Sequence, residues 1–277
     1  MKTFLSDELK KVCAEGEAFS WIDQLADAAS ENDIYREKEG RKTFRFSLGQ
    51  RSFFAKLHKG VGWNEIFKNL FKLRLPVLGA INEYLAIQAL TDVGIETMAV
   101  EAFGEAGFNP AKRYSFIVTE ELYNTVSLED YCQHWLKKPP PYRDKRLLIE
   151  KLARVSRVMH GAGINHRDYY ICHFHLDVDT LTEGQPRCYL IDLHRAQRRS
   201  VTPKRWLIKD LAGLYYSAMD AGLTRRDLLR FVAVYSSMPA SQAIEQNRTF
   251  WLAVAKRARK LYVRDHGKQP LAMPLNL

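Results

Sequence analysis

The sequence predicts an α+β fold in which a small antiparallel-sheet lobe precedes a larger, mainly helical lobe. The first observation is a group of strand-like segments, at 43–57, 97–104 and 113–119. The second is the prevalence of helical patterns from Leu128 onward. The third is length: 277 residues with 46% apolar side chains suit one bilobal unit. We place the lobes at residues 1–120 and 121–277.

Within the first lobe, the clearest element is a hairpin. Thr43–Leu48 alternates in polarity, Gly49 opens a turn, and Ser52–Leu57 runs back. Helical periodicity is expected over three further segments, at 1–38, 63–75 and 80–92. Pro76 and Gly79 would end the second of these, and Gly94 the third.

Within the second lobe, Pro139–Pro141 interrupts two helices, and apolar residues follow one face of a helix over 144–160. Gly161 and Gly163 end that helix. Short strands are expected next, at 174–178 and 188–193. Further helices are expected over most of 204–265.

Composition limits the location and the partners. Acidic residues arrive at Asp7 and Glu8 before any apolar run forms, and no segment approaches a bilayer span, so we expect neither a signal peptide nor a transmembrane helix. The four cysteines show no zinc-ligand spacing, which suits a reducing compartment. A formal charge of +10 favours an anionic partner: nucleic acid, an anionic membrane surface, an acidic protein or a phosphorylated substrate.

The segment most informative about chemistry is Ile164-Asn165-His166-Arg167-Asp168. A helix ends, two glycines turn the chain, and an apolar residue leads into His-Arg-Asp. In phosphoryl transfer from a nucleotide, an aspartate in this context orients the acceptor hydroxyl and takes its proton. We therefore predict that Asp168 is the catalytic base of a phosphotransferase with a protein-kinase-like fold.

Nucleotide-binding residues are expected in the first lobe. Lys56 lies between apolar residues on a strand, and Glu83 opens a helix where its carboxylate would hold the Lys56 amine near the phosphates. Taken alone, each has a plain alternative, an edge lysine in water and an acid favoured by the helix dipole. Between the lobes, the backbone at Glu120 and Leu122 is expected to read the adenine edge.

Metal binding is expected at Asp192, which ends an apolar strand 24 residues after Asp168. It would hold the Mg²⁺ that bridges the nucleotide phosphates. His173 stands where the kinase pattern has a second ligand, Asn, and imidazole is a poor ligand for Mg²⁺. We keep His173 as a weaker metal candidate, and assign His166 and Asp210 structural roles, with Asp210 bonding the catalytic-loop backbone.

These motifs resemble those of the lipopolysaccharide core heptose(I) kinases of Gram-negative bacteria, over nearly the whole chain. The resemblance is densest in six runs, at 54–63, 75–80, 115–122, 165–174, 191–197 and 202–206. It implies ATP-dependent phosphorylation of the first inner-core heptose on Kdo-lipid A, at the cytoplasmic face of the inner membrane, with Asp168 as the active-site acid. It also implies acyl carrier protein, in acylated form, as an optional partner.

The sequence departs from the general kinase pattern in two further respects. It has no glycine-rich loop over the phosphates, so cover would come from Arg41, Lys42 or backbone, and no Ala-Pro-Glu element closes the segment after Asp192.

Acceptor binding is expected from the basic segment that follows Asp192, because arginine suits sugar carboxylates and lipid phosphates. The candidates are Arg195, Arg198, Arg199, Lys204 and Arg205. The amphipathic stretch Phe67–Leu75 would either lie in a membrane interface or pack on the sheet. No nucleic-acid reader motif accompanies the charge, so nucleic acid is not expected as a partner.

Two alternatives stay open. One is a kinase that acts on Kdo, another heptose or a protein hydroxyl. The other is a non-catalytic scaffold that binds acyl carrier protein or lipid.

Overall fold

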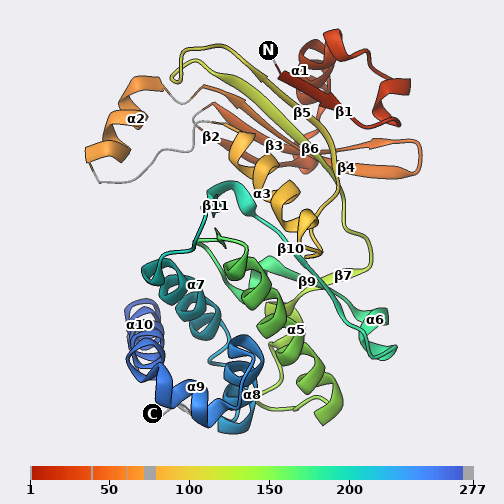
Figure 1. Cartoon of the computed structure of the whole chain (residues 1–277). Helices are drawn as coiled ribbons and strands as arrows, with labels where there is room; N and C mark the ends of the chain where they lie inside the picture. Colours follow the sequence, from red (N-terminus) through yellow and green to blue (C-terminus); the bar gives the residue numbers. More distant parts are fainter. Residues whose placement is uncertain (1, 39, 61, 72–78, 271–277) are drawn as a thin grey trace. The chain divides into compact units, whose positions relative to one another are not determined.

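The computed structural model describes residues 2–38, 40–60, 62–71 and 79–270 (Figure 1). The chain divides into two compact units. Unit 1 comprises Met1–Gln88 and Met98–Tyr123, and unit 2 comprises Ala89–Thr97 and Asn124–Leu277. The α+β class is confirmed: unit 1 holds an antiparallel sheet, and unit 2 is mainly helical.

Unit 1 is built on a six-stranded sheet of order β1-β5-β6-β4-β3-β2, with every neighbouring pair antiparallel. Its strands are β1 Lys2–Leu5, β2 Ile34–Lys38, β3 Arg41–Leu48, β4 Arg51–Lys59, β5 Val100–Ala106 and β6 Tyr114–Glu120. The predicted hairpin is confirmed, since β3 pairs with β4 from Arg41↔His58 to Leu48↔Arg51. Gly49 has a φ of 60° at the tight two-residue turn.

The expectation of helix throughout residues 1–38 was wrong. Only α1, Ala18–Ala28, is an α-helix there, with short 3₁₀ turns at Leu9–Lys11, Glu15–Glu17 and Glu31–Asp33. Residues at both ends of the segment are strands, because β1 pairs with β5 and β2 with β3. Pairing partners that are distant in sequence outweigh the local periodicity.

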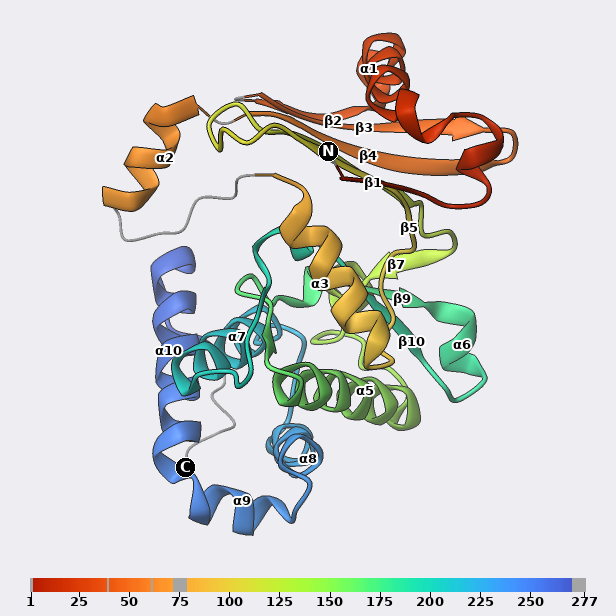
Figure 2. The same ribbon diagram turned by 45° about the horizontal axis from the view of Figure 1, so that its top comes forward.

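Helix α1 and the sheet share an apolar core in unit 1. Ile22 of α1 packs in it with Phe44, Ala55 and Leu57 of the sheet. Figure 2 shows α1 on one face of the sheet and the first turns of α3, Ile81–Asp92, on the other. The predicted helix at 63–75 is α2, Gly62–Phe71, and its remaining positions 72–75 lie outside the described residues.

Unit 2 is a helical assembly that carries two small sheets. Its helices are α4 Leu128–Cys132, α5 Tyr142–Gly161, α6 Val178–Thr182, α7 Lys204–Ser217, α8 Arg225–Ser236, α9 Ala240–Gln246 and α10 Arg248–His266. One sheet has the order β10-β9-β7, and the other pairs β11 with β8. Their strands are β7 Thr125–Ser127, β8 Ile164–Asn165, β9 Phe174–Asp177, β10 Arg187–Leu190 and β11 Gln197–Arg198.

The core of unit 2 holds the segment that contains Asp168 in place. Apolar residues of α7, α8, α9 and α10 form one cluster, with Leu211, Val232, Ala243 and Trp251 among its buried members. Tyr169, the residue after Asp168, is fully buried, and its hydroxyl hydrogen-bonds that of Ser156 on α5 at 2.9 Å. The loop is therefore anchored to the helical core next to Asp168. No helix in the described ranges is both long and apolar enough to cross a membrane.

Candidate active site

The backbone of the His166–Asp168 loop is held by a carboxylate beneath it. Asp210 of α7 is fully buried, and its two oxygens accept from the backbone N–H groups of His166 at 2.6 Å and Arg167 at 2.9 Å. Arg167 has a φ of 78°, a conformation that costs energy for a residue with a side chain. The two hydrogen bonds help to hold the chain in this conformation immediately before Asp168.

The other side of the loop is fixed by a close backbone approach. Gly163 has a φ of 78°, and a Cβ there would clash with the carbonyl oxygen of Arg199. The Arg199 N–H donates to the Gly163 carbonyl at 2.9 Å, next to the β8–β11 pairing. Only glycine permits this approach, which brings the basic segment after Asp192 beside the His166–Asp168 loop.

The Asp168 carboxylate is partly buried and is contacted by cations. Arg195 Nη1 donates to its two oxygens at 2.9 and 2.8 Å, and Lys209 Nζ lies 4.0 Å from Oδ1. Burial lowers the pKa of the Lys209 amine to about 8, although Asp168 favours its charged form. Asp168 thus lies at a strongly electropositive position within unit 2.

Two stacked histidines support the loop from within. His166 is buried, its Nε2 lies 2.9 Å from the Ile191 carbonyl, and burial lowers its pKa, so the neutral ring donates this hydrogen bond. His173 stacks on His166 with ring centroids 5.7 Å apart, and its Nδ1 lies 2.7 Å from the Asp168 carbonyl. His173 therefore donates to the backbone of the residue proposed as base.

Asp192 follows β10 and has a φ of 60°. Its Oδ1 is 2.6 Å from His194 Nδ1, and its Oδ2 is 3.5 Å from His173 Nε2. Within the described parts of the chain, no group of three or more His, Cys, Asp and Glu side chains is arranged to hold a metal ion. A single carboxylate suits Mg²⁺ that arrives with nucleotide phosphates and keeps its waters, and it does not suit a resident metal.

The predicted pair of unit 1 is brought together. Lys56 Nζ donates to Glu83 Oε1 at 2.6 Å, and the Glu83 side chain is almost fully buried on α3. Lys56 lies opposite Thr43 of β3 and Ile117 of β6 on the sheet face away from α1. A buried carboxylate bound to an amine of opposite charge fixes the position of that amine.

Strand register separates the two candidates for phosphate cover. Arg41 is two residues from Thr43 along β3, so it shares the sheet face of Lys56. Lys42 pairs with Leu57 on the opposite face, and its Nζ donates to the Ala26 carbonyl of α1 at 2.6 Å. Of the two, only Arg41 faces the same way as Lys56.

The expected adenine-reading segment lies at the end of β6. The backbone N–H of Glu120 donates to the Ala99 carbonyl at 3.0 Å, and the side chain accepts from Arg51. The Glu121 N–H donates to the Ser52 carbonyl at 2.9 Å. These bonds fix the course of the chain up to Leu122 within unit 1.

Comparison with known proteins agrees with this arrangement. The model of the lipopolysaccharide kinase (Kdo/WaaP) family matches residues 26–235, which is most of the chain. The chain belongs to this family. The predicted resemblance and the enzyme class, a phosphotransferase, are thereby confirmed.

Similar proteins cover nearly the full length. The lipopolysaccharide core heptose(I) kinase WaaP of Pseudomonas aeruginosa is 46% identical over 265 residues, which are 95% of this chain and 97% of that protein. The protein of the same name from Escherichia coli strain K12 is 49% identical, with 95% and 98% covered. A solved structure, WaaP in complex with acyl carrier protein, has 42% identity and a TM-score of 0.79, and covers 95% of this chain and 100% of that chain.

In this member of the family, the five basic candidates do not form one group. Arg195 contacts Asp168, Arg198 is exposed on β11, and Lys204 lies over the Phe250 ring at 5.9 Å. Arg199 and Arg205 instead gather around Trp206, with their guanidinium carbons 5.8 and 5.4 Å from its ring.

Sequence reasoning counted Lys209 in the basic segment that follows Asp192 without singling it out, and it assigned no role to Trp206. A usable signal was present, because positions 205, 206 and 209 are neighbours on one helix face by i,i+3 and i,i+4 spacing. The contact between Arg195 and Asp168 joins positions 27 residues apart, and no local sequence pattern predicts it.

Proposed function

We propose that this chain is an ATP-dependent kinase that phosphorylates the first heptose of the lipopolysaccharide inner core on Kdo-lipid A. The observation that carries the proposal is the Asp168 loop, anchored by Asp210 and presented among cations. The Lys56–Glu83 pair of unit 1 supplies the expected amine for nucleotide phosphates. The heptose(I) kinase names of its relatives support the choice of acceptor.

In the proposed mechanism, Asp168 accepts a hydrogen bond from the acceptor hydroxyl and takes its proton late, as the bond to the γ-phosphorus of ATP forms and the bond from that phosphorus to the departing ADP breaks. Arg195 now donates to both carboxylate oxygens, so the hydroxyl takes over one of these bonds on binding. Arg195 then remains close enough to neutralise charge on the transferred group.

The nucleotide would be held chiefly by residues of unit 1. Lys56, fixed by Glu83, draws negative charge from the phosphates. Arg41 shares its sheet face and would add a second cation, in place of a glycine-rich loop. The backbone at Glu120 and Leu122 would read the adenine edge.

Asp192 would hold Mg²⁺ together with the nucleotide phosphates, and the ion, when bound, would neutralise charge on the transferred group. Carboxylate oxygen is a preferred ligand of this cation, and imidazole is not. His173 therefore acts through the Asp168 carbonyl, with Nε2 directed at Asp192, and is the weaker metal candidate.

Substitution of the base tests the proposal. Purified Asp168→Asn, supplied with ATP and a heptosyl-Kdo-lipid A acceptor, should lose roughly 10²–10⁴-fold in kcat, because general-base catalysis contributes about that much. Mass spectrometry of the acceptor locates the added phosphate. Thermal denaturation shows whether the variant is folded.

The wild-type result separates the alternatives. Phosphate on Kdo or on a second heptose would indicate a kinase with another acceptor. No turnover of ATP with any core acceptor would favour a non-catalytic scaffold. Full activity of a folded Asp168→Asn variant would rule out the assigned base.

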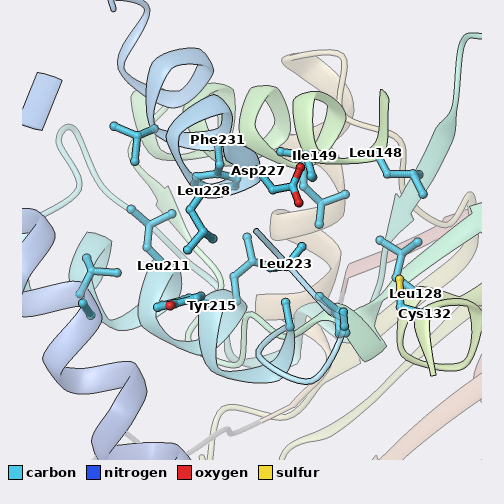
Figure 3. Close-up of a pocket in the computed structure, with 18 of the residues that line it drawn as sticks. Leu128, Cys132, Leu148, Ile149, Leu211, Tyr215, Leu223, Asp227, Leu228 and Phe231 are labelled. Atoms are coloured by element: carbon cyan, nitrogen blue, oxygen red, sulfur yellow. The ribbon is translucent and has the colours of Figure 1, made fainter. Parts of the chain in front are cut away.

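Acyl carrier protein is proposed as a partner, because a relative's structure is a complex with it. Unit 2 has an apolar cavity of about 110 Å³ that is lined by residues of α5, α7, α8 and α10, among them Leu148, Leu211 and Leu228 (Figure 3). The charge in its lining, Asp227, is paired with Lys145 at 2.9 Å. A cavity near this size holds one small apolar molecule, so it would take the end of an acyl chain.

An acyl-chain comparison tests this partner. Binding of acylated carrier protein should exceed binding of the unacylated form, and Ala255→Phe, which fills the cavity, should remove the difference. Leu252→Phe is the matched control, because Leu252 lies on the exposed side of the same helix, α10. Equal affinity of both carrier forms for the wild type would remove the cavity from the interaction.

A peripheral position at the anionic inner-membrane surface, on its cytoplasmic side, completes the proposal. Helix α2 exposes large aromatic side chains: Trp63 at 49%, Phe67 at 50% and Phe71 at 88%. They follow i, i+4, i+8 spacing and so form one stripe, while Ile66 is buried. An aromatic stripe beside Lys68 suits a membrane interface.

A further inference from the structure

One indole ring in unit 2 is surrounded by cations. Measured to the Trp206 ring centroid, Arg167 Cζ lies at 5.2 Å, Arg205 Cζ at 5.4 Å, Lys209 Nζ at 5.7 Å and Arg199 Cζ at 5.8 Å. They come from three segments: the catalytic loop, the chain after β11, and α7. We call Arg167, Arg199, Arg205, Lys209 and Trp206 the Trp206 cluster.

The four cations of the Trp206 cluster outnumber the two carboxylates, Asp168 and Asp210, that act on Arg167 and Lys209. Within the ranges that the structure describes, Arg167, Arg199 and Arg205 form no ion pair with a carboxylate. Arg199 donates to the neutral amides of Asn165 and Gln197, and Arg167 Nε is buried without a partner. Lys209 reaches Asp168 only at 4.0 Å. Like charges held this close repel one another unless an anion lies between them.

The start of α7 adds a second, independent conflict. The helix begins at Lys204 after Pro203, with no acidic residue in its first turn. Cations are disfavoured there, because the helix dipole is positive at that end. The same backbone N–H groups favour an anion. A basic first turn that destabilises its own helix indicates a ligand.

From this arrangement we infer that the Trp206 cluster is an anion site that binds an oxyanion of the acceptor, a sugar carboxylate or a lipid phosphate. The inference rests on the proposed function and names the acceptor group that the site reads. The planar guanidinium of arginine pairs with two oxygens of a carboxylate or of a phosphate through two hydrogen bonds. The Trp206 ring keeps the cations in place when the ligand is absent.

The position of the cluster gives the bound anion a role in catalysis. Lys209 is within reach of both the Trp206 ring and Asp168, and Arg167 directly precedes Asp168. An acceptor whose anion lies in the Trp206 cluster has its neighbouring hydroxyl directed to the base. Binding energy away from the reacting atom is thereby used for orientation.

The test compares Arg205→Gln with Arg226→Gln. Arg205 is exposed, so its loss leaves the fold intact; Arg226 is an exposed arginine on α8, and its removal changes the net charge equally. Arg205→Gln should raise the KM for heptosyl-Kdo-lipid A by roughly tenfold to a hundredfold, as for a lost charged hydrogen bond. The KM for ATP should stay as in the wild type, and Arg226→Gln should change neither.

Two acceptor forms identify the source of the anion. One acceptor form has its carboxyl group reduced, and the other has its lipid dephosphorylated. The wild type should lose affinity for the form that lacks the anion bound by the Trp206 cluster. With that form, Arg205→Gln should cause no further loss. An equal penalty of Arg205→Gln on all acceptor forms would overturn the inference. A raised KM for ATP instead would assign the cluster to the nucleotide.

Calorimetry keeps the inference separate from the proposed function. If the wild type phosphorylates no heptose, the heptosyl-Kdo fragment is titrated into it without ATP. Binding that is lost on carboxyl reduction, or in Arg205→Gln, would still support the anion site. Equal binding of the acid and reduced fragments, with no effect of Arg205→Gln, would show that the site does not bind the carboxylate. The same titration with the dephosphorylated lipid shows whether the site binds the phosphate.

Discussion

At the scale of single residues, Lys209 has a partly buried amine close to Asp168, the proposed base. It faces Asp168 and Asp210, which favour its charged form, and Arg195 and Arg167, which oppose it. Burial is the largest influence and lowers the pKa from 10.5 to about 8. The amine is therefore mostly charged below pH 8 and mostly neutral above it. If Lys209 helps to bind an acceptor anion, that help is lost as pH rises through 8.

Binding of the acceptor should weaken at alkaline pH. In the wild type, the KM for the acceptor should rise above pH 8. In Lys209→Arg it should rise only at higher pH, because a guanidinium stays charged there. Steady-state kinetics at saturating ATP measure this, with Arg226→Gln as the control for net charge. Superimposable profiles of the wild type and Lys209→Arg would contradict a role for this amine.

Predictability from sequence differs among the site residues. Asp168, Asp192, Lys56 and Glu83 stand in motifs with a fixed chain order, and the structure brings Lys56 to Glu83. The contact between Arg195 and Asp168 depends on how β11 pairs with β8, which no local pattern shows. The sequence showed only a segment rich in arginine, and that composition suggested sugar binding. The catalytic and binding roles of these site residues stay predictions until substitution tests them.

At the scale of elements, the β8–β11 pairing depends on Gly163. A side chain there would clash with the Arg199 carbonyl and would need a positive φ. Gly161, two residues earlier at the end of α5, is surrounded by open space, and a Cβ at that position would meet no atom within 4 Å. The two glycines therefore differ in what they do, although they share one motif.

Alanine substitution should separate the two glycines. Gly163→Ala should lower the free energy of unfolding by about 2 kcal/mol or more, from the strained backbone and the close contact together. Gly161→Ala should be neutral or stabilise by up to about 1 kcal/mol, because alanine favours helix. Urea denaturation measures both. Equal stabilities would mean that the loop relaxes to admit a side chain at 163.

Strand prediction succeeded where the partner strand is close in sequence. The β3–β4 hairpin closes over a two-residue turn, so its alternation and its glycine lie in one short segment. Strand β1 pairs with β5 across about a hundred residues, with Lys2 opposite Glu105. Nothing in residues 2–5 specifies that partner, and a four-residue segment of mixed polarity fits a helix equally well.

At the scale of the whole molecule, net charge and one aromatic stripe together favour a membrane surface. The formal charge is +10, and α2 presents Trp63, Phe67 and Phe71 on one side. Charge brings a protein to anionic lipid over a distance that salt shortens, while buried aromatic rings are insensitive to salt. Binding through both should decline only in part as salt increases.

Vesicle flotation tests this expectation. Phe71→Ser should weaken binding to anionic vesicles several-fold, because it removes the most exposed ring of the stripe. Tyr35→Ser is the control, since Tyr35 is an exposed ring of unit 1 that lies on β2, outside the α2 stripe. If both variants weaken binding equally, or neither does, α2 is not the membrane contact.

Helix α7 links two functional parts proposed for unit 2, the Asp168 loop and the Trp206 cluster. Its buried Asp210 fixes the loop that carries the proposed base, and its first turns carry Arg205, Trp206 and Lys209. A helix rises 1.5 Å per residue, so the helix fixes the spacing between these groups. An acceptor with its charge one sugar further away would still bind, but it would offer the wrong hydroxyl. Regiochemistry would then be set by the length of a helix turn.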